Sequence, residues 1–514
     1  MPSAREISYS LPVPVDGLRL DMDPTSMPPT ALVYGTQNVV LRRGRVQPRY
    51  GFSSFASDVG APVRGVIDYG PSVGLTGVGV GIPDSMVAGT DSAWYKYAAG
   101  SWTALTGAIS ASNHIIFRIF SKNGIGYVVG INDGVDFPKR WDGVAAGIST
   151  VGGSPPKPKA MMLLANRLLL FNLTGGGAYS GVVSPSGYDV SAFNDFEAGW
   201  STTLNGLLID TPGDIVAALE MGDLQGVIYK SDAIIMAVAQ AATVPFHFEW
   251  KSFGNVGPVN SRCVFSVQDG SHIYLGADGG VYRFDGVTPV SLGVHIQKAI
   301  LRAADLDLTQ LATKAWGFYD KTRNEAFFYF KGTGVAVISG VMIALSNLSV
   351  WPVSIGISGN DTTAGGLFYI PSVTTPRVAF FTGSTGKSWY DNYNSTDNGS
   401  SISIGITYPV SDLGLPAAWK TLTEIDARIA FTVDDPGYTN AGGSQDLILQ
   451  VEAGDGGDIS TPQTDTVTVS LGGGPYIRSY RYSARLLGLT LVGPSTKFWE
   501  FRGATLRATL RGER

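Results

Sequence analysis

The segment GGVYRFDGVTPVSLG, residues 279–293, contains the pattern that decides the fold. Aromatic and β-branched residues lead to the pair Asp285–Gly286, and a second short apolar run returns from it. Glycine accepts the positive φ that a tight type I′ turn needs, so this pattern predicts a β-hairpin. Trp94–Leu105 (WYKYAAGSWTAL) and Phe137–Thr150 (FPKRWDGVAAGIST) repeat the pattern with different residues.

Less regular copies of the hairpin pattern recur through the middle of the chain. They lie at Asn166–Gly175, Gly226–Val238, Asn324–Trp351 and Val378–Asn392. Units of several strands that recur at roughly 40–60 residues are typical of propeller blades. The sequence therefore predicts a β-propeller of about six or seven irregular blades over residues 61–395. A short helical insertion is expected near residues 294–318, where apolar residues return at helical spacing.

The two ends of the chain depart from this pattern. Residues 1–60 are rich in proline and contain short apolar runs, which predict an N-terminal β arm. After residue 396 the segments alternate apolar and polar residues between closely spaced turns. Strict alternation is typical of strands with one buried face, so residues 396–514 predict a C-terminal β-sandwich. The predicted fold class is all-β.

The composition excludes several classes of protein. Only 15% of the residues are charged and the net charge is −5, so the chain is not a bulk binder of polyanions. The longest uncharged run, Gly332–Asn360, contains Pro352 and no apolar block long enough to cross a membrane. No membrane-spanning segment is expected.

Motifs that carry common catalytic chemistry are missing from the sequence. The single cysteine, Cys263, excludes a disulfide framework and a cysteine-based zinc site. The four histidines lie far apart, and no GxSxG, P-loop, HExxH or EF-hand pattern occurs. The sequence therefore predicts no catalytic residue, no cofactor and no metal site, and we do not expect an enzyme.

One acidic cluster leaves an alternative open. Asp189, Asp195 and Glu197 lie within residues 187–200 (GYDVSAFNDFEAGW), and a pair of carboxylates can hydrolyse a glycosidic bond. Ordinary solvated loop acids explain the same pattern. The alternative hypothesis is a phage or extracellular propeller that binds or hydrolyses host polysaccharide.

Two groups of arginines are candidate partner-interface residues. Closely spaced positive charges on a strand either protect a solvated edge or contact an acidic partner. The candidates are Arg42, Arg43, Arg45 and Arg49 near the N-terminus, and Arg478, Arg481 and Arg485 in the predicted sandwich.

Residues 17–52 (GLRLDMDPTSMPPTALVYGTQNVVLRRGRVQPRYGF) resemble the opening of the tail nozzle proteins of short-tailed bacteriophages, also called tail tubular protein B or tail stabilisation proteins. The matching elements are Gly17-Leu18, Pro28-Pro29, Asn38-Val39-Val40, Arg43-Gly44-Arg45 and Arg49-Tyr50-Gly51. Asp214–Gly286 resembles the longest block shared by that family. The resemblance covers residues 15–395, and the sandwich matches only in general character.

The resemblance implies a structural function. Proteins of this family form a ring, a homohexamer, that continues the DNA ejection channel below the portal and adaptor and offers attachment surfaces for tail fibres. The implied partners are further copies of the chain, the head-to-tail adaptor, tail fibres or spikes, and double-stranded DNA in transit. The implied location is the virion tail, after synthesis in the host cytoplasm. A weakly acidic chain suits this role, because Lys and Arg contacts to phosphates would retain passing DNA.

Overall fold

The computed structural model describes most of residues 5–511. The ranges outside the described residues are 43, 70–85, 99, 176–182, 201–204, 241–245, 254–256, 303–307, 331–339, 355–361, 369, 371–375, 392–395, 414, 416–417, 432–443, 456–457, 460–462, 471–474 and 498. Within the described part nearly every element is a strand, and the two α-helices are α1 (Val294–Arg302) and α2 (Leu308–Lys314). They lie in the region where the sequence predicts a helical insertion.

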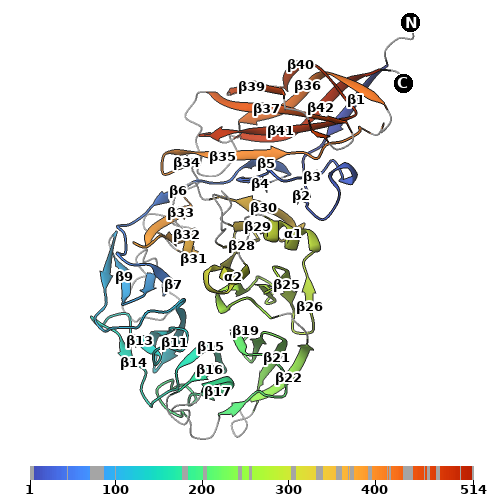
Figure 1. The fold of residues 1–514 in the computed structure, drawn as a ribbon. Helices are drawn as coiled ribbons and strands as arrows, with labels where there is room; N and C mark the ends of the chain where they lie inside the picture. The colour runs from blue at the N-terminus through green and yellow to red at the C-terminus, as the bar shows by residue number, and fades with distance from the viewer. Residues whose placement is uncertain are drawn as a thin grey trace.

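The described strands form a ring of seven blades with a β-sandwich stacked beside blades 6 and 7 (Figure 1). With the innermost strand first, blades 1 to 4 are β7 (Val63–Asp68), β8 (Met86–Thr90), β9 (Trp94–Ala98) and β10 (Ser101–Ala104); β11 (Ile116–Lys122), β12 (Ile125–Ile131), β13 (Lys139–Trp141) and β14 (Ser149–Thr150); β15 (Pro158–Leu164), β16 (Arg167–Thr174), β17 (Val183–Val190) and β18 (Gly206–Leu207); and β19 (Ile215–Glu220), β20 (Gln225–Lys230), β21 (Ala233–Ala239) and β22 (Phe246–Phe253). Blades 5 to 7 are β23 (Val264–Ser266), β24 (His272–Leu275), β25 (Val281–Phe284) and β26 (Pro289–Ser291); β27 (Trp316–Asp320), β28 (Glu325–Tyr329), β29 (Gly340–Ala344) and β30 (Ser349–Val353); and β31 (Thr362–Phe368), β32 (Arg377–Thr382), β33 (Lys387–Asp391) and β6 (Phe52–Ser54).

The ring is closed. The innermost strands of successive blades contact one another, and β31 of blade 7 contacts β7 of blade 1. The outermost strand of blade 7 is β6, which comes from the N-terminus and pairs antiparallel with β33, with Phe52 opposite Asp391. The predicted fold class, a propeller with a C-terminal sandwich, is confirmed.

Large aromatic side chains fill the spaces between neighbouring blades. Trp94 of blade 1 packs edge-to-face on Phe117 of blade 2, with ring centroids 4.8 Å apart. Trp141, Trp351 and Trp389 are fully buried. Aromatic pairs of this kind add to the area they bury, so they contribute strongly to the contacts between blades.

The sandwich consists of two six-stranded sheets. One contains β1 (Glu6–Leu11), β4 (Val39–Arg42), β5 (Arg45–Pro48), β36 (Trp419–Phe431), β40 (Pro475–Ala484) and β42 (Trp499–Arg511). The other contains β34 (Thr396–Asp397), β35 (Ser400–Thr407), β37 (Ser444–Asp455), β38 (Asp458–Ile459), β39 (Gln463–Ser470) and β41 (Leu486–Ser495). Their inward residues, among them Leu422, Leu447 and Leu506, share one apolar core.

The N-terminal residues are distributed over both units instead of forming a separate layer. Strands β1, β4 and β5 belong to the sandwich, β6 completes blade 7, and β2 (Gly17–Leu18) and β3 (Ala31–Leu32) extend blade 6; the 3-10 helix η1 (Pro24–Ser26) lies between β2 and β3. Gly17 has a φ of +64°, and a Cβ there would lie 2.7 Å from the carbonyl oxygen of Val350. Only glycine therefore permits β2 to join β30 at this point.

Among the described residues, no helix is both long and apolar enough to cross a membrane.

We expect the substitution Phe52→Ala to weaken ring closure. The Phe52 side chain is buried and packs edge-to-face on Phe380, with centroids 4.7 Å apart. Its truncation leaves a cavity that costs about 3–5 kcal/mol of the free energy of unfolding. Urea unfolding measures this loss. The matched control is Ser54→Ala, at an exposed position of the same strand, and equal midpoints for the two variants would contradict the expectation.

A buried histidine joins blades 4 and 5. His272 Nε2 lies 2.9 Å from the carbonyl oxygen of Glu220, and Nδ1 lies 2.9 Å from the hydroxyl of Tyr229. Since a carbonyl only accepts, Nε2 carries the proton and Nδ1 accepts from the hydroxyl. Burial lowers the pKa of His272 to about 4.

This lowered pKa predicts a loss of stability in acid. In the unfolded chain His272 binds a proton below its ordinary pKa of 6.5. In the folded chain the same histidine stays neutral until the pH falls to about 4. Stability from this group is therefore complete above pH 6.5 and falls as the pH drops to 4, by up to about 3 kcal/mol. Unfolding free energies at pH 7 and pH 4.5 measure it. His272→Gln should reduce the difference, whereas His247→Gln, at an exposed position, should leave it unchanged.

Candidate functional site

The N-terminal segment passes between the propeller and the sandwich and bonds to both. The amide of Val33 donates to the carbonyl of Thr407, and Gln37 exchanges two backbone hydrogen bonds of 3.0 Å with Gly405. Gly405 and Thr407 both belong to the sandwich strand β35. The next amide, of Asn38, donates to the carbonyl of Pro352 on β30 of blade 6. The chain therefore changes partner from sandwich to propeller within two residues.

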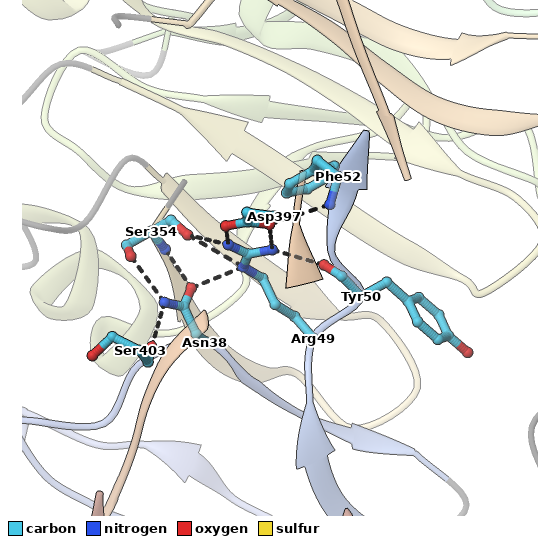
Figure 2. A network of polar contacts seen from close by, with 7 residues as sticks. All are labelled: Asn38, Arg49, Tyr50, Phe52, Ser354, Asp397 and Ser403. Carbon is cyan, nitrogen blue, oxygen red and sulfur yellow. Dashed lines mark hydrogen bonds and ion pairs between the residues drawn. The ribbon is translucent and has the colours of Figure 1, made fainter. Parts of the chain in front are cut away.

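Asn38 is the centre of the polar network at this junction (Figure 2). Its backbone has a φ of +55°, a conformation that asparagine tolerates better than most residues. The Nδ2 group donates to the hydroxyl of Ser354 at 2.9 Å and to the carbonyl of Ser403 at 2.7 Å. The Oδ1 atom accepts from the amide of Ser354 at 2.7 Å and from Nε of Arg49 at 2.9 Å. All four hydrogen bonds open to an amide are made.

Arg49 and Asp397 form a buried, bidentate ion pair beside Asn38. Nη1 and Nη2 of Arg49 lie 2.9 and 2.6 Å from the two carboxylate oxygens, and the side chains are only 5% and 1% exposed. The guanidinium also donates to the carbonyls of Tyr50 and Ser354, each at 2.7 Å. Oδ1 of Asp397 accepts a further bond from the amide of Phe52. Arg49 therefore lies in the interior of the chain and is not available to a partner.

Further charges surround this pair. The guanidinium carbons of Arg42 and Arg323 lie 3.9 and 4.8 Å from the centroid of the Tyr50 ring. Arg323 donates to Asp391 at 2.6 Å. Burial raises the pKa of Glu325, although Arg42 and Arg323 act in the opposite direction. The junction is therefore a compact set of opposite charges that link blades 6 and 7 with the sandwich.

The other candidate arginines that the structure describes belong to the sandwich. Arg45 pairs with Glu500, which also accepts from Arg502 at 3.0 Å. Arg485 is exposed and its guanidinium lies 5.9 Å from the Trp419 ring. Arg478 and Arg481 lie on β40, which pairs with β36, and Arg43 lies outside the described residues. A partner role for these residues stays a prediction.

Two acids of the cluster in residues 187–200, Asp195 and Glu197, form ion pairs with basic side chains. Nζ of Lys122 lies 2.5 Å from Asp195 and 2.9 Å from Glu197, and Arg140 lies 3.0 Å from Glu197. Burial would raise the pKa of Asp195, but hydrogen bonds from Lys122 and from the backbone hold it below its usual range. A general acid needs the opposite shift. Asp189 is fully buried and accepts from the amide of Val190.

Within the described ranges, no group of three or more His, Cys, Asp or Glu side chains is placed to hold a metal ion. Cys263 is free and buried, and burial raises the pKa of its thiol to about 12.

The sequence contained a signal for the junction, although its meaning is visible only in three dimensions. Asn38 and Arg49 both belong to the segment that resembles the nozzle family. Their partners Ser354, Asp397 and Ser403 follow more than 300 residues later along the chain. Spacing along the chain could not bring these groups together.

Comparisons with known proteins add only weak similarities. No family model and no curated protein match the chain. Among solved structures, the chain resembles U3-55K, with 9% identity over 66% of this chain and 98% of that chain, at a TM-score of 0.40. It also resembles YCF48 bound to D1 peptide, with 10% identity over 71% and 99% at 0.40. The extracellular domain of BT4673 from B. thetaiotaomicron matches with 11% identity over 67% of this chain at 0.40, and the match spans 40% of that domain chain. Similarities this low carry no argument about function.

We expect the substitution Arg49→Met to destabilise the whole chain. It leaves the buried Asp397 carboxylate without its cation, and breaking one side of a buried pair costs about 3–5 kcal/mol. The pair Arg49→Met and Asp397→Asn, measured singly and together by urea unfolding, gives the coupling energy.

The matched control removes a similar cation from a more exposed pair. Arg45→Met breaks the contact to Glu500, where the arginine side chain is 38% exposed, and should cost no more than about 1 kcal/mol. Equal losses for Arg45→Met and Arg49→Met would show that the buried network has no special weight.

Proposed function

We propose that this protein is a structural component of the bacteriophage virion that forms the ring-shaped tail nozzle. In this role it continues the DNA ejection channel below the portal and adaptor and offers surfaces for tail fibres. The observation that carries the proposal is the position of residues 17–52. The segment that resembles the nozzle family is the same segment that ties propeller to sandwich.

The elements of the resemblance occupy architectural positions in the fold. Gly17 permits the pairing of β2 with blade 6, and Asn38 and Arg49 hold the buried junction. A Cβ on Gly51 would lie 1.9 Å from the carbonyl oxygen of Thr396, so this glycine is needed where the chain passes the sandwich. A resemblance at such positions supports a shared architecture and not a shared chemistry.

The physical demands of a nozzle are consistent with this structure. A conduit for DNA must keep its parts in fixed relation while its contents move. The two units are joined here by the buried hydrogen bonds of Asn38 and by the buried pair of Arg49 and Asp397. A net charge of −5 gives little attraction to the phosphates of passing DNA.

The alternative of polysaccharide hydrolysis receives less support. Asp195 and Glu197 share the ammonium of Lys122, and the pKa of Asp195 is held below its usual range. We therefore propose the structural role alone.

The native mass of the purified chain tests this proposal. We expect a ring of six copies, about 326 kDa for a protomer of 54.3 kDa, with a central hole in negative-stain class averages. The ring is expected either for the chain alone or after mixing with its head-to-tail adaptor, because an adaptor can act as a template. A chain that remains monomeric in the presence of that adaptor contradicts the proposal.

A further inference from the structure

One mouth of the propeller axis contains a polar pocket to which the proposed function assigns no role. The pocket has a volume of about 320 Å³ and lies where the innermost strands of the blades begin. Its lining includes Arg64, Asn113, Arg262, Lys314 and Ser384, which come from blades 1, 2, 5, 6 and 7 or the segments leading into them. The pocket is therefore formed by residues from five of the seven blades.

Among the residues that the structure describes, positive charges outnumber negative charges at this mouth. Arg64, Arg262 and Lys314 line the pocket. Lys159, at the start of β15, acts electrostatically on His114 and Asp133, as Arg262 does. Within the described ranges, two carboxylates accompany these four cations. One of them, Asp91, forms an ion pair with Arg64 through two hydrogen bonds of 2.7 and 2.8 Å.

The second carboxylate faces a histidine that carries no charge. Nε2 of His114 lies 3.5 Å from Asp133. Burial lowers the pKa of His114 to about 3, with Arg262 and Lys159 acting in the same direction, so the imidazole is neutral at ordinary pH. Counted over the described residues alone, these groups leave an excess of about two positive charges at the pocket.

Arg262 holds the unsatisfied part of this charge. It lies in the 3-10 helix η3 (Ser261–Cys263), and its Nη1 and Nη2 donate to the carbonyls of Thr363 and Thr313 at 2.8 and 3.0 Å. Its buried Nε has no hydrogen-bond partner, and within the described residues no carboxylate lies within ion-pair distance. Burial lowers the pKa of Arg262 to about 10. Arg262 is half-buried, and Asp133 acts on it only through space. A cation without a directly bonded carboxylate is costly to bury, and an anion in the pocket would offset that cost.

The other mouth of the axis has a different character. The pocket there has a volume of about 650 Å³ and is lined by Glu220 and Asp223 where β11, β15 and β19 end. Glu220 pairs with Arg118 at 3.4 Å, and no lysine or arginine is among the described residues that line this second pocket. An anion near the axis is therefore drawn to the first mouth.

We propose that the mouth lined by Arg262 and Lys314 binds a small phosphate-bearing anion. A guanidinium and an ammonium are the donors that phosphate oxygens accept most strongly, and Thr362 adds a hydroxyl to the lining. A volume of about 320 Å³ lies within the range of small-molecule sites, about 300–1,000 Å³. The pocket therefore has room for a phosphomonoester as well as for free phosphate.

Isothermal titration calorimetry of the full chain at low salt tests this proposal, with inorganic phosphate and glucose 6-phosphate as probes and glucose as the uncharged control. Binding of either phosphate, with none of glucose, is the expected result. The tighter of the two probes tells whether the ligand is the free anion or a phosphorylated small molecule. Absence of binding by both overturns the proposal.

Two variants assign the binding to this mouth. Lys314→Gln removes one donor, and Ser384→Glu places a carboxylate at an exposed position of the lining. Each should raise the dissociation constant for phosphate by about tenfold or more. Lys321→Gln is the matched control, because it removes an exposed lysine just beyond the far end of the innermost strand β27. Equal affinity in Ser384→Glu and in the unaltered chain, or an equal loss in Lys321→Gln, overturns the assignment. Thermal melts without ligand establish that each variant is folded.

Discussion

The buried ion pair between Arg49 and Asp397 is the constraint on which the arrangement of the two units depends. Arg49 follows the sandwich strand β5, and its partner Asp397 lies on β34. Asp397 also accepts a hydrogen bond from the amide of Phe52, the first residue of the strand that closes blade 7. One carboxylate thus fixes the end of the sandwich segment and the beginning of the closing strand. The position of the sandwich and the closure of the ring are consequences of the same contact.

The polar character of this junction gives it geometric definition. Apolar side chains of similar volume would pack in several ways, whereas a guanidinium with defined donors and an amide with four partners accept one arrangement. Each group of the network left without its partner would carry a desolvation cost. The junction therefore specifies one relative placement of propeller and sandwich.

The sequence predicted the blades because each hairpin is local. The pair Asp285–Gly286 lies between two strands of one blade, and its meaning is contained within about fifteen residues. The closing strand β6 could not be predicted in the same way, because Phe52 pairs with Asp391 across most of the chain. The pocket at the mouth of the axis is likewise beyond local patterns, since Arg64, Arg262 and Lys314 meet only when the ring is closed. The basic neighbours of Arg49 in the sequence predict a surface cluster, but the Arg49 side chain is buried because it pairs with the distant Asp397.

The use of an N-terminal strand to complete the last blade has a consequence for biosynthesis. Residues 52–54 are synthesised long before β33. The N-terminal strand therefore has no partner strand until several hundred further residues have emerged from the ribosome. During that interval the strand can pair with the open blade of a neighbouring nascent chain, which is the geometry of domain swapping. Polysomes, where identical chains emerge side by side, are the place where such exchange between copies is most favoured. The arrangement that closes one ring is thus also a means by which two copies of this chain can become interlocked.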